Sequence, residues 1–457
     1  MDPRKIDCFK AYDVRGRLGI DLDDDVAYRI GRAFAEGRGA KTVIVGRDSR
    51  ESSPRLAQAL IAGLTDGGAD VRDQGLAGTE EMYFATANSG ADGGIEVTAS
   101  HNPIDYNGMK LVGKGAAPLD PDTEFLALAD LARSGNFRDG NAKGRVTPYP
   151  EARATYVRAV ADFIDAGTLR PLRILVNAGN GTAGPTFDAL ADELLRRGAP
   201  LDFIRINHDP DASFPNGIPN PLLPENQGMT ANPVREAGAD LGIAWDGDFD
   251  RCFFFDENGR FIPGEYLVGL LAAAFLERHP GEKIVHDPRV VLNTRDMIAT
   301  AGGQAIQART GHAFLKKAMR EHGAIYGGEM SAHHYFRDFH FADSGMIPWL
   351  LVIELMSKRG ASLSSLLDER MRAFPSSGEI NFRLDNPDAA IDRVVARFAP
   401  EAISRDDTDG ISLEFDGWRF NLRRSNTEPV VRLNVESVGD AALVENRQRE
   451  VAALLAA

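Results

Sequence analysis

Three aspartates at alternate positions, Asp246, Asp248 and Asp250, directly follow an apolar segment at 241–245 that predicts a buried strand. Carboxylates that converge in a tight loop at a strand end could hold one hard cation. Because all of these ligands are oxygens, the set favours Mg²⁺ or Ca²⁺ over zinc. A solvated acidic turn is the simpler alternative for the same residues.

An EF-hand loop is a further interpretation, because the three aspartates and Glu257 match the spacing of its ligands. The sharp turn of that loop needs glycine at the position where this chain has Arg251. The residues on both sides, 241–245 and 252–256, predict strands where an EF-hand needs helices. The pattern therefore favours a magnesium site over a calcium sensor.

Ser100 is a candidate for covalent chemistry. It follows the strand predicted at 94–97 and lies in the segment Thr98–Pro103, next to His101. A serine beside a histidine could be a nucleophile, although most loop serines only cap or form turns. The sequence has no Gly-x-Ser-x-Gly elbow, so an α/β-hydrolase is not indicated. The hydroxyl of Ser100 therefore needs another activating group.

Two further segments have side chains suited to ligand binding. Residues 423–429 (Arg-Arg-Ser-Asn-Thr-Glu-Pro) offer guanidinium, hydroxyl, amide and backbone N–H groups that suit a phosphate dianion, with a solvated polar loop as the alternative. Residues 327–334 combine two glycines with Glu329, Ser331 and His333, which can bond hydroxyl groups. Adjacent histidines there could also indicate a metal, but no other His or Cys has a helpful spacing.

The elements that must position these residues alternate between strand and helix. Three such cycles of about 100 residues predict three related α/β domains, with mainly parallel or mixed sheets covered by helices on both faces. Asn107-Gly108, between Tyr106 and Met109, predicts a tight hairpin turn. The clearest strands are expected at 42–46, 94–97, 172–176, 241–245 and 283–286, and the clearest helices at 53–64, 265–278 and 294–301.

The end of the chain has a different pattern. Strands at 411–415, 418–422 and 430–435, the first two joined by an Asp416-Gly417 turn, precede a helix from about residue 440. This order predicts a hairpin plus a third strand in a smaller α+β domain.

Composition bounds the remaining possibilities. At 457 residues the chain is too long for one core, so we expect three or four domains. With 43% hydrophobic and 26% charged residues, no membrane-length apolar run, no signal-peptide pattern and only two cysteines, we expect a soluble cytoplasmic protein. The net charge of −15 argues against nucleic acid or an anionic membrane as partner, and no obligate protein partner is evident. An anionic substrate must therefore be held by local Arg and Lys.

Taken in order, these segments resemble the α-D-phosphohexomutase family. The shared motifs are Tyr-Asp-x-Arg-Gly at 12–16, Thr-Ala-Ser-His-Asn-Pro at 98–103, Asp-Gly-Asp-x-Asp-Arg at 246–251, Gly-Glu-x-Ser at 328–331 and Arg-x-Ser-Asn-Thr-x-Pro at 423–429. Residues 78–81, 214–221 and 328–336 are similar to bacterial phosphomannomutases in particular. The chain departs from the family at Arg309, where lysine is more frequent.

The resemblance implies an α/β fold of four domains around a central cleft. Three related α/β domains with mixed sheets would occupy residues 1–150, 151–258 and 259–370. They would carry the phosphoserine loop, the metal loop and the sugar-binding loop, respectively. A smaller α+β domain at 371–457 would carry a phosphate-binding loop.

The resemblance also implies a role for each matching residue. Ser100 would carry a phosphoryl group, with Arg15, His101 and Lys110 around it as the other catalytic residues. Asp246, Asp248 and Asp250, together with phosphorylated Ser100, would bind Mg²⁺. The implied substrate-binding residues are Tyr12, Arg251, His312, Glu329, Ser331, His333, Arg423, Ser425, Asn426 and Thr427.

The activity implied by the resemblance is reversible interconversion of mannose 1-phosphate and mannose 6-phosphate. It would pass through a phosphoserine and a hexose 1,6-bisphosphate, which is also the activator, and would serve GDP-mannose supply in carbohydrate metabolism. A dual-specificity phosphoglucomutase/phosphomannomutase is a second interpretation, because mannose and glucose differ only at C2 and no residue is an evident C2 reader. A magnesium-dependent sugar phosphatase is a third, and a non-enzymatic calcium-binding or interaction protein is a fourth.

Overall fold

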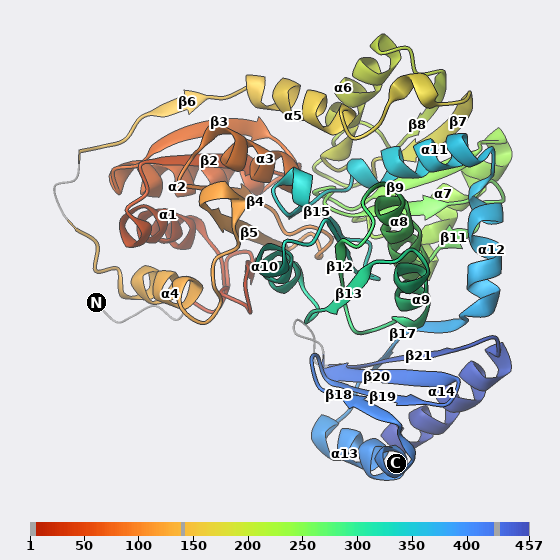
Figure 1. The fold of residues 1–457 in the computed structure, drawn as a ribbon. Helices are drawn as coiled ribbons and strands as arrows, with labels where there is room; N and C mark the ends of the chain where they lie inside the picture. The colour runs from red at the N-terminus through yellow and green to blue at the C-terminus, as the bar shows by residue number, and fades with distance from the viewer. Residues whose placement is uncertain (1–5, 139–141, 425–429, 457) are drawn as a thin grey trace. The chain divides into compact units, whose positions relative to one another are not determined.

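The computed structural model describes residues 6–138, 142–424 and 430–456. The chain forms two compact units, Met1–Phe261 with Asp338–Gly360 and Ile262–Arg337 with Ala361–Ala457. Figure 1 labels their helices and strands. Among the helices in the described ranges, none combines the length and apolar character needed to cross a membrane.

The first unit begins with a six-stranded mixed sheet in the order β1-β5-β4-β2-β3-β6. Strands β4, β2, β3 and β6 run parallel, whereas β5 pairs antiparallel with both β4 and β1. The elements are β1 (Val14–Arg17), α1 (Asp24–Arg38), β2 (Thr42–Arg47), α2 (Ser53–Asp66), β3 (Asp70–Leu76), α3 (Thr79–Ser89), β4 (Gly93–Val97), β5 (Tyr106–Gly113), α4 (Glu124–Ser134) and β6 (Val146–Pro148).

The hairpin predicted at Asn107-Gly108 is wrong, because both residues lie inside β5. Neither has the positive φ that a two-residue hairpin turn requires. A Cβ on Gly108 would overlap the backbone oxygen of Val14, so glycine is needed here for close approach of β1 to β5. Asn107 instead donates its side-chain amide to the hydroxyls of Ser52 and Ser53, at 2.7 and 2.9 Å.

The second sheet of the first unit repeats the same design. Its order is β11-β10-β9-β7-β8, with β7 parallel to β8 and β9, and β10 antiparallel to β9. The elements are α5 (Glu151–Ala161), β7 (Leu172–Asn177), α6 (Ala183–Arg196), β8 (Leu201–Ile206), α7 (Pro224–Ala237), β9 (Leu241–Trp245), β10 (Cys252–Phe255) and β11 (Phe261–Ile262). The segment 338–360 of this unit adds β16 (Ala342–Asp343), which is not a strand of this sheet, and α11 (Ile347–Arg359).

The second unit contains the third cycle. Here β12 runs parallel to β13 and β14, and β15 pairs antiparallel with β14. The elements are α8 (Gly264–Arg278), β12 (Lys283–His286), α9 (Leu292–Thr300), β13 (Gln304–Gln307), α10 (His312–His322), β14 (Tyr326–Gly328), β15 (His334–Phe336) and α12 (Leu363–Ala373). The predicted mixed sheets are thus confirmed in all three α/β cycles.

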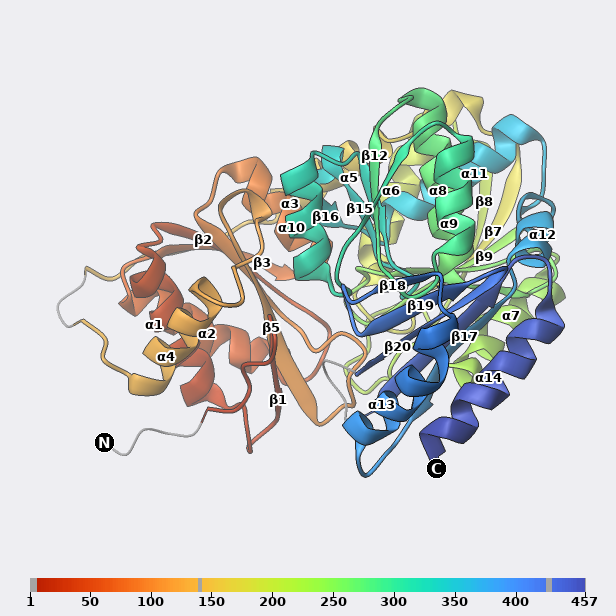
Figure 2. The same ribbon diagram turned by 60° about the horizontal axis from the view of Figure 1, so that its bottom comes forward.

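The chain ends in a fully antiparallel sheet, β17-β21-β20-β19-β18, with α13 and α14 packed together on one face (Figure 2). The predicted smaller α+β domain is therefore confirmed, although β17, β18 and α13 were not anticipated. Both missed strands are mostly polar, and a bulge interrupts β17. The elements are β17 (Ser376–Phe382), α13 (Pro387–Phe398), β18 (Ser404–Asp406), β19 (Ile411–Phe415), β20 (Trp418–Arg424), β21 (Val431–Ser437) and α14 (Ala441–Ala456).

A buried ion pair joins this last sheet to the third cycle inside the second unit. Arg419 contacts Glu436 at 2.5 Å and also donates to the carbonyl oxygens of Pro288 and Arg289. The Glu436 carboxylate accepts the backbone N–H groups of Val291 and Leu292, at 2.8 and 2.9 Å, where α9 begins. One acidic side chain thus satisfies free donors at a helix start contributed by another domain.

We expect Arg419→Met to lower the free energy of unfolding of the second unit by about 3–5 kcal/mol, because it leaves the Glu436 charge buried without its guanidinium. Urea denaturation followed by tryptophan fluorescence and calorimetry would measure this loss. Arg405→Met removes an arginine from an exposed ion pair of the same sheet and should change stability by less than about 1 kcal/mol. Equal losses of unfolding free energy in the two variants would show that the buried contact of Arg419 with Glu436 has no special role in stability.

Candidate active site

Ser100 lies on a strained turn just beyond β4. Its φ of 50° is in the left-handed region, which is unusual for a residue other than glycine. The backbone N–H of Ser100 donates to the hydroxyl of Thr98 at 2.8 Å, which fixes the first part of the turn. Only 5% of the Ser100 residue is exposed. The side chain is therefore held in one place by the fold.

Arg50, which no sequence motif indicated, fixes the rest of this loop. It is 1% exposed, and its guanidinium donates to four backbone carbonyl groups. These acceptors are Ser100 O at 2.9 Å, Asn102 O at 2.6 Å, Pro103 O at 2.9 Å and Tyr106 O at 3.1 Å. A buried arginine that satisfies several loop carbonyls replaces the regular backbone pairing that this segment lacks.

The Ser100 hydroxyl meets three predicted site residues. It donates to Asp246 Oδ2 at 2.7 Å, lies 3.1 Å from His101 Nδ1 and accepts from Arg251 Nη2 at 3.2 Å. Arg251 also donates through Nε to Asp246 Oδ2 at 2.9 Å and contacts His101 Nδ1. The loop after β4 and the loop after β9 therefore meet at this hydroxyl.

The three predicted aspartates converge, with a carboxylate oxygen from each within 4.8 Å of the others. Asp246, Asp248 and Asp250 are all at most 1% exposed. Lys110 Nζ donates to Asp248 Oδ2 at 2.8 Å and also contacts Asp250 Oδ2, while the Thr79 hydroxyl donates to Asp248 Oδ2 at 2.6 Å. Burial opposes ionisation here, but the Lys110 ammonium outweighs it and lowers the pKa of Asp248.

The second oxygens of these carboxylates make the group suitable for a cation. Oδ1 of Asp246 and Oδ1 of Asp248 are buried and accept no hydrogen bond within the described ranges of the chain. Uncompensated carboxylate oxygens are costly away from water, and a metal ion would satisfy them. The three aspartates therefore form a group that could bind a metal.

The loop that carries the aspartates is pressed against the Ser100 loop. A Cβ on Gly247 would lie 2.6 Å from the carbonyl oxygen of Ser100, so a larger residue would separate the two loops. Thr182 donates its N–H and hydroxyl to Gly247 O, at 3.1 and 2.9 Å. The strands predicted on both sides of the loop are confirmed, and their antiparallel pairing excludes the EF-hand interpretation.

Two further predicted residues of the first unit, Arg15 and Tyr12, lie on β1 and just before it. Arg15, on β1, donates to Thr98 O at the base of the Ser100 turn. Tyr12 lies half-buried in the bend that precedes β1. Although much of His101 is exposed, its Nδ1 lies against Ser100 Oγ and Arg251 Nη2, which desolvates the ring, and Arg251 and Arg15 add positive charge. Together these effects hold the pKa of His101 well below its usual range.

Glu96 is a buried carboxyl group that no sequence motif indicated. It lies on β4 directly opposite Lys110 of β5, is fully buried, and has no hydrogen-bond partner among the described residues. Gly46 of β2 leaves room for this carboxyl group, because a Cβ there would overlap it. Burial, followed by the negative charges of Asp48 and Asp248, raises the pKa of Glu96 well above its usual range.

The second unit assembles a separate group of predicted residues around Glu329, which is 1% exposed. Its carboxylate accepts the N–H of Gly311 at 2.9 Å, just before His312 at the start of α10, and the hydroxyl of Tyr335 at 2.6 Å. His333 Nδ1 lies 3.3 Å from Glu329 Oε2 and 3.3 Å from Ser331 Oγ. Glu329, Ser331 and His333 are thus brought together, and His312 directly follows Gly311, whose N–H contacts Glu329.

Arg423 is connected to this group through two residues that the sequence did not indicate. Its guanidinium donates to Glu379 at 3.2 Å, and Arg289 contacts the same carboxylate at 3.6 Å. Arg289 also donates to Ser331 Oγ at 3.2 Å. Burial and the positive charge of Arg289 lower the pKa of Arg423. The predicted Ser425, Asn426 and Thr427 lie outside the described residues.

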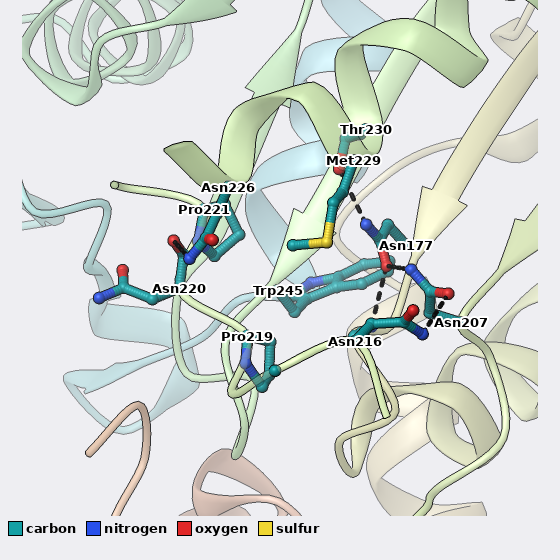
Figure 3. Close-up of a pocket in the computed structure, with 12 residues that line it drawn as sticks. Asn177, Asn207, Asn216, Pro219, Asn220, Pro221, Asn226, Met229, Thr230 and Trp245 are labelled. Atoms are coloured by element: carbon teal, nitrogen blue, oxygen red, sulfur yellow. Dashed lines mark hydrogen bonds between the residues drawn. The ribbon is translucent and has the colours of Figure 1, made fainter. Parts of the chain in front are cut away.

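A small pocket lies in the second α/β cycle (Figure 3). Trp245 and Met229 contribute apolar lining, and three asparagines stand on one side. Asn177 accepts from Asn207 at 3.1 Å, and Asn216 donates to Asn207 at 2.9 Å. Because these amides bond one another, they anchor the proline-rich loop before α7 close to Trp245, the residue that precedes Asp246.

Comparison with known proteins identifies the class of protein that carries these groups. Four domain families described as Phosphoglucomutase/phosphomannomutase match the chain. They are alpha/beta/alpha domain I at residues 7–136, alpha/beta/alpha domain II at 154–259, alpha/beta/alpha domain III at 263–374 and the C-terminal domain at 379–454. The chain therefore belongs to the phosphoglucomutase/phosphomannomutase family, and the predicted four-domain fold class is confirmed.

Individual relatives are similar along the whole chain. A Phosphomannomutase of Salmonella montevideo is 58% identical over 450 residues, which cover 98% of this chain and 98% of that protein. A protein of Xanthomonas campestris pv. campestris named Phosphohexose mutases is 54% identical, with the same coverage. A crystal structure of a Phosphoglucomutase/phosphomannomutase family protein from Burkholderia thailandensis has a TM-score of 0.86 and 34% identity, and covers 97% of this chain and 96% of that chain.

We expect Glu96→Gln to change the pH dependence of stability. The folded-state pKa of Glu96 is raised, so its carboxyl group stabilises the fold at a pH below its unfolded pKa of about 4.3, and this contribution is lost as the pH rises. A glutamine side chain does not titrate, so the variant lacks this pH-dependent contribution. The stability of the variant relative to the unmodified protein should therefore increase between about pH 5 and pH 8, by up to about 1.4 kcal/mol per pH unit.

Urea denaturation at several pH values would measure this difference. Glu51→Gln, which removes an exposed carboxyl group of the same domain, should follow the pH dependence of the unmodified protein. A Glu96→Gln variant with that same pH dependence would show that Glu96 does not titrate as argued.

Proposed function

We propose that this protein is a phosphomannomutase that interconverts mannose 1-phosphate and mannose 6-phosphate through a phosphorylated Ser100. The observation that carries this proposal is the Ser100 hydroxyl, held 2.7 Å from Asp246 at the edge of three buried carboxylates and beside Arg251. Membership of the phosphoglucomutase/phosphomannomutase family supports it, as do relatives of 51–58% identity named Phosphomannomutase.

Catalysis of phosphoryl transfer depends mainly on positioning the reacting groups and on neutralising the charge of the transferring phosphoryl group. When phosphorylated Ser100 donates, the bond from phosphorus to Ser100 Oγ breaks and a bond from phosphorus to a sugar hydroxyl oxygen forms. The hydroxyl loses its proton, and Ser100 Oγ regains one before the phosphoryl group returns. Neutral His101, with Nδ1 3.1 Å from Ser100 Oγ, is placed to exchange that proton.

The cations around Ser100 would offset the charge of the transferring group. Arg251 lies in hydrogen-bond contact with Ser100 Oγ, and Arg15 contacts the base of the Ser100 turn. Lys110 reaches Asp248 and Asp250 and would stabilise negative charge added to this cluster. These side chains supply locally the positive charge that a net-acidic chain lacks overall.

The three aspartates fit Mg²⁺, because this ion prefers oxygen ligands. In addition, Oδ1 of Asp246 and Oδ1 of Asp248 are buried and accept no hydrogen bond from the described residues, so they are available to a cation. We infer that Asp246, Asp248, Asp250 and a phosphate oxygen on Ser100 hold this ion. When bound, it would neutralise charge on the transferring phosphoryl group.

The residues of the second unit would bind the sugar and the phosphate that does not react. Glu329 and Ser331 offer hydrogen bonds to sugar hydroxyls, with His333 adjacent to Glu329 and His312 next in sequence to Gly311, which contacts Glu329. Arg423, Ser425, Asn426 and Thr427 would hold the non-reacting phosphate, with Tyr12 and Arg251 completing the substrate-binding set. Because the hexose 1,6-bisphosphate must turn over between the two transfers, these groups must accept either phosphate. Added hexose 1,6-bisphosphate would activate the enzyme by phosphorylating Ser100.

We expect Ser100→Ala to reduce conversion of mannose 1-phosphate by at least about 1,000-fold, because the group that carries the phosphoryl is removed. Mannose 6-phosphate would be measured with Mg²⁺ and a trace of hexose 1,6-bisphosphate. Ser134→Ala, at an exposed serine of the same domain, should retain full activity. Chelation of divalent cations should abolish activity both in Ser134→Ala and in the unmodified protein.

Parallel assays with glucose 1-phosphate and for inorganic phosphate would decide between the candidate activities. Comparable rates on both sugars would establish a dual-specificity mutase, since the C2 hydroxyl is then not discriminated. Release of inorganic phosphate without isomerisation would replace the mutase proposal with a sugar phosphatase.

A further inference from the structure

The start of α3 contacts the aspartate loop although the two are 169 residues apart in sequence. Thr79 is fully buried and binds Asp248 twice. Its hydroxyl donates to Asp248 Oδ2 at 2.6 Å, and its backbone N–H donates to Asp248 O at 3.2 Å. Asp248 Oδ1, the other oxygen of this carboxylate, accepts no hydrogen bond in the part of the chain that is described. Thr79 thus fixes the carboxylate with one oxygen left for a cation.

The residue before Thr79 restrains the same loop through packing. A Cβ on Gly78 would overlap the ring of Phe249, so the ring lies directly on the backbone where α3 begins. Phe249 stands between Asp248 and Asp250 and has a φ of 46°, in the left-handed region. Such a backbone persists only where its surroundings hold it, and the buried ring is one such restraint.

Glu80 reaches the loop from a third direction. It is fully buried, and it accepts the N–H of Gly345 at 2.5 Å and the hydroxyl of Tyr156. Gly345 packs so closely on the loop that a Cβ would overlap Phe249 O, and its own carbonyl accepts the Trp245 indole N–H at 2.9 Å. Glu80 therefore holds the segment that supports the loop from its other side.

We propose that Gly78, Thr79 and Glu80 are positioning residues for the aspartate loop, and that the Thr79 hydroxyl sets the affinity of this protein for a divalent cation. This inference rests on the proposed metal site. The reason is geometric: a carboxylate that can rotate must lose that freedom when it binds an ion, whereas Thr79 holds Asp248 in advance. Hydrogen-bond partners behind metal ligands typically change metal affinity by about 10–100-fold when they are removed.

The test compares variants of one helix in the full-length protein. Thr79→Val keeps the side-chain shape and removes the hydroxyl, and Thr79→Ser restores it. Thr86→Val is the matched control, because Thr86 is equally buried on α3 but donates its hydroxyl to Met82 O at 2.8 Å, within the helix. Mn²⁺ binding without substrate would be followed by electron paramagnetic resonance, and Mg²⁺ would be measured by competition.

We expect Thr79→Val to weaken Mn²⁺ and Mg²⁺ binding by about 10–100-fold, whereas Thr79→Ser and Thr86→Val bind like the unmodified protein. The kcat of Thr79→Val should recover as the Mg²⁺ concentration is raised, with little change in KM for mannose 1-phosphate. Should Thr79→Val fail to fold, Glu80→Gln replaces it, because it weakens the contact with Gly345 and should also lower cation affinity.

Three results would overturn the proposal. Unchanged cation affinity in a folded Thr79→Val protein would show that the hydroxyl does not position Asp248. An equal loss in Thr86→Val would show that any buried change on α3 has this effect. If the unmodified protein binds no Mn²⁺, the metal site under the proposed function fails, and this inference fails with it; the first two results leave that metal site intact.

Discussion

The structure depends on keeping charges of both signs together where water is excluded. Asp246, Asp248 and Asp250 are buried with Lys110 and Arg251, and each ion is tolerated only because an opposite charge or a hydrogen-bond donor lies beside it. Buried charge pairs of this kind are costly to assemble, and they are a poor source of stability. Their value lies in the strong and fixed electrostatic field that they create at the Ser100 hydroxyl.

Fixing that field requires loops from distant parts of the chain to approach very closely. Gly247 brings the aspartate loop against the Ser100 carbonyl, and Gly78 lets Phe249 pack on the start of α3. Ser100 and Phe249 are both held in the left-handed backbone region at these contacts. Two strained residues in two touching loops indicate that the surrounding hydrogen bonds determine their conformations, with Arg50 serving the first loop and Thr79 the second.

The repeated mixed sheet explains where the loops lie. In each α/β cycle, parallel strands end on the same side of the sheet, and the carboxyl ends of such strands are where α/β proteins place their sites. Ser100 follows β4, the aspartates follow β9, and Glu329 follows β14. Each of the three α/β cycles thus has a chemically different group in the loop that follows one of its parallel strands.

Much of this arrangement could be predicted from the sequence, because strands with continuous apolar residues and motifs of fixed spacing are local features. The strand at 241–245 and the aspartates after it are an example. Residues such as Arg50, Thr79 and Glu96 could not be found in this way, since their roles arise from contacts with residues far along the chain. Asn107-Gly108 was misleading for the same reason: the pair is typical of a hairpin, but packing against β1 and α2 decides its conformation.

The central claim is that Ser100 carries the phosphoryl group between the enzyme and the sugar. The most direct measurement is to phosphorylate the protein with hexose 1,6-bisphosphate, remove the excess, and locate the phosphate by peptide mass spectrometry. Mannose 1-phosphate is then added for a single turnover. We expect one phosphate, on Ser100; when it carries an isotopic label, the label passes to the sugar in equal amount while the sugar's original phosphoryl group replaces it on Ser100. Isomerisation while Ser100 stays unmodified, or transfer of its phosphate to water alone, would contradict this claim.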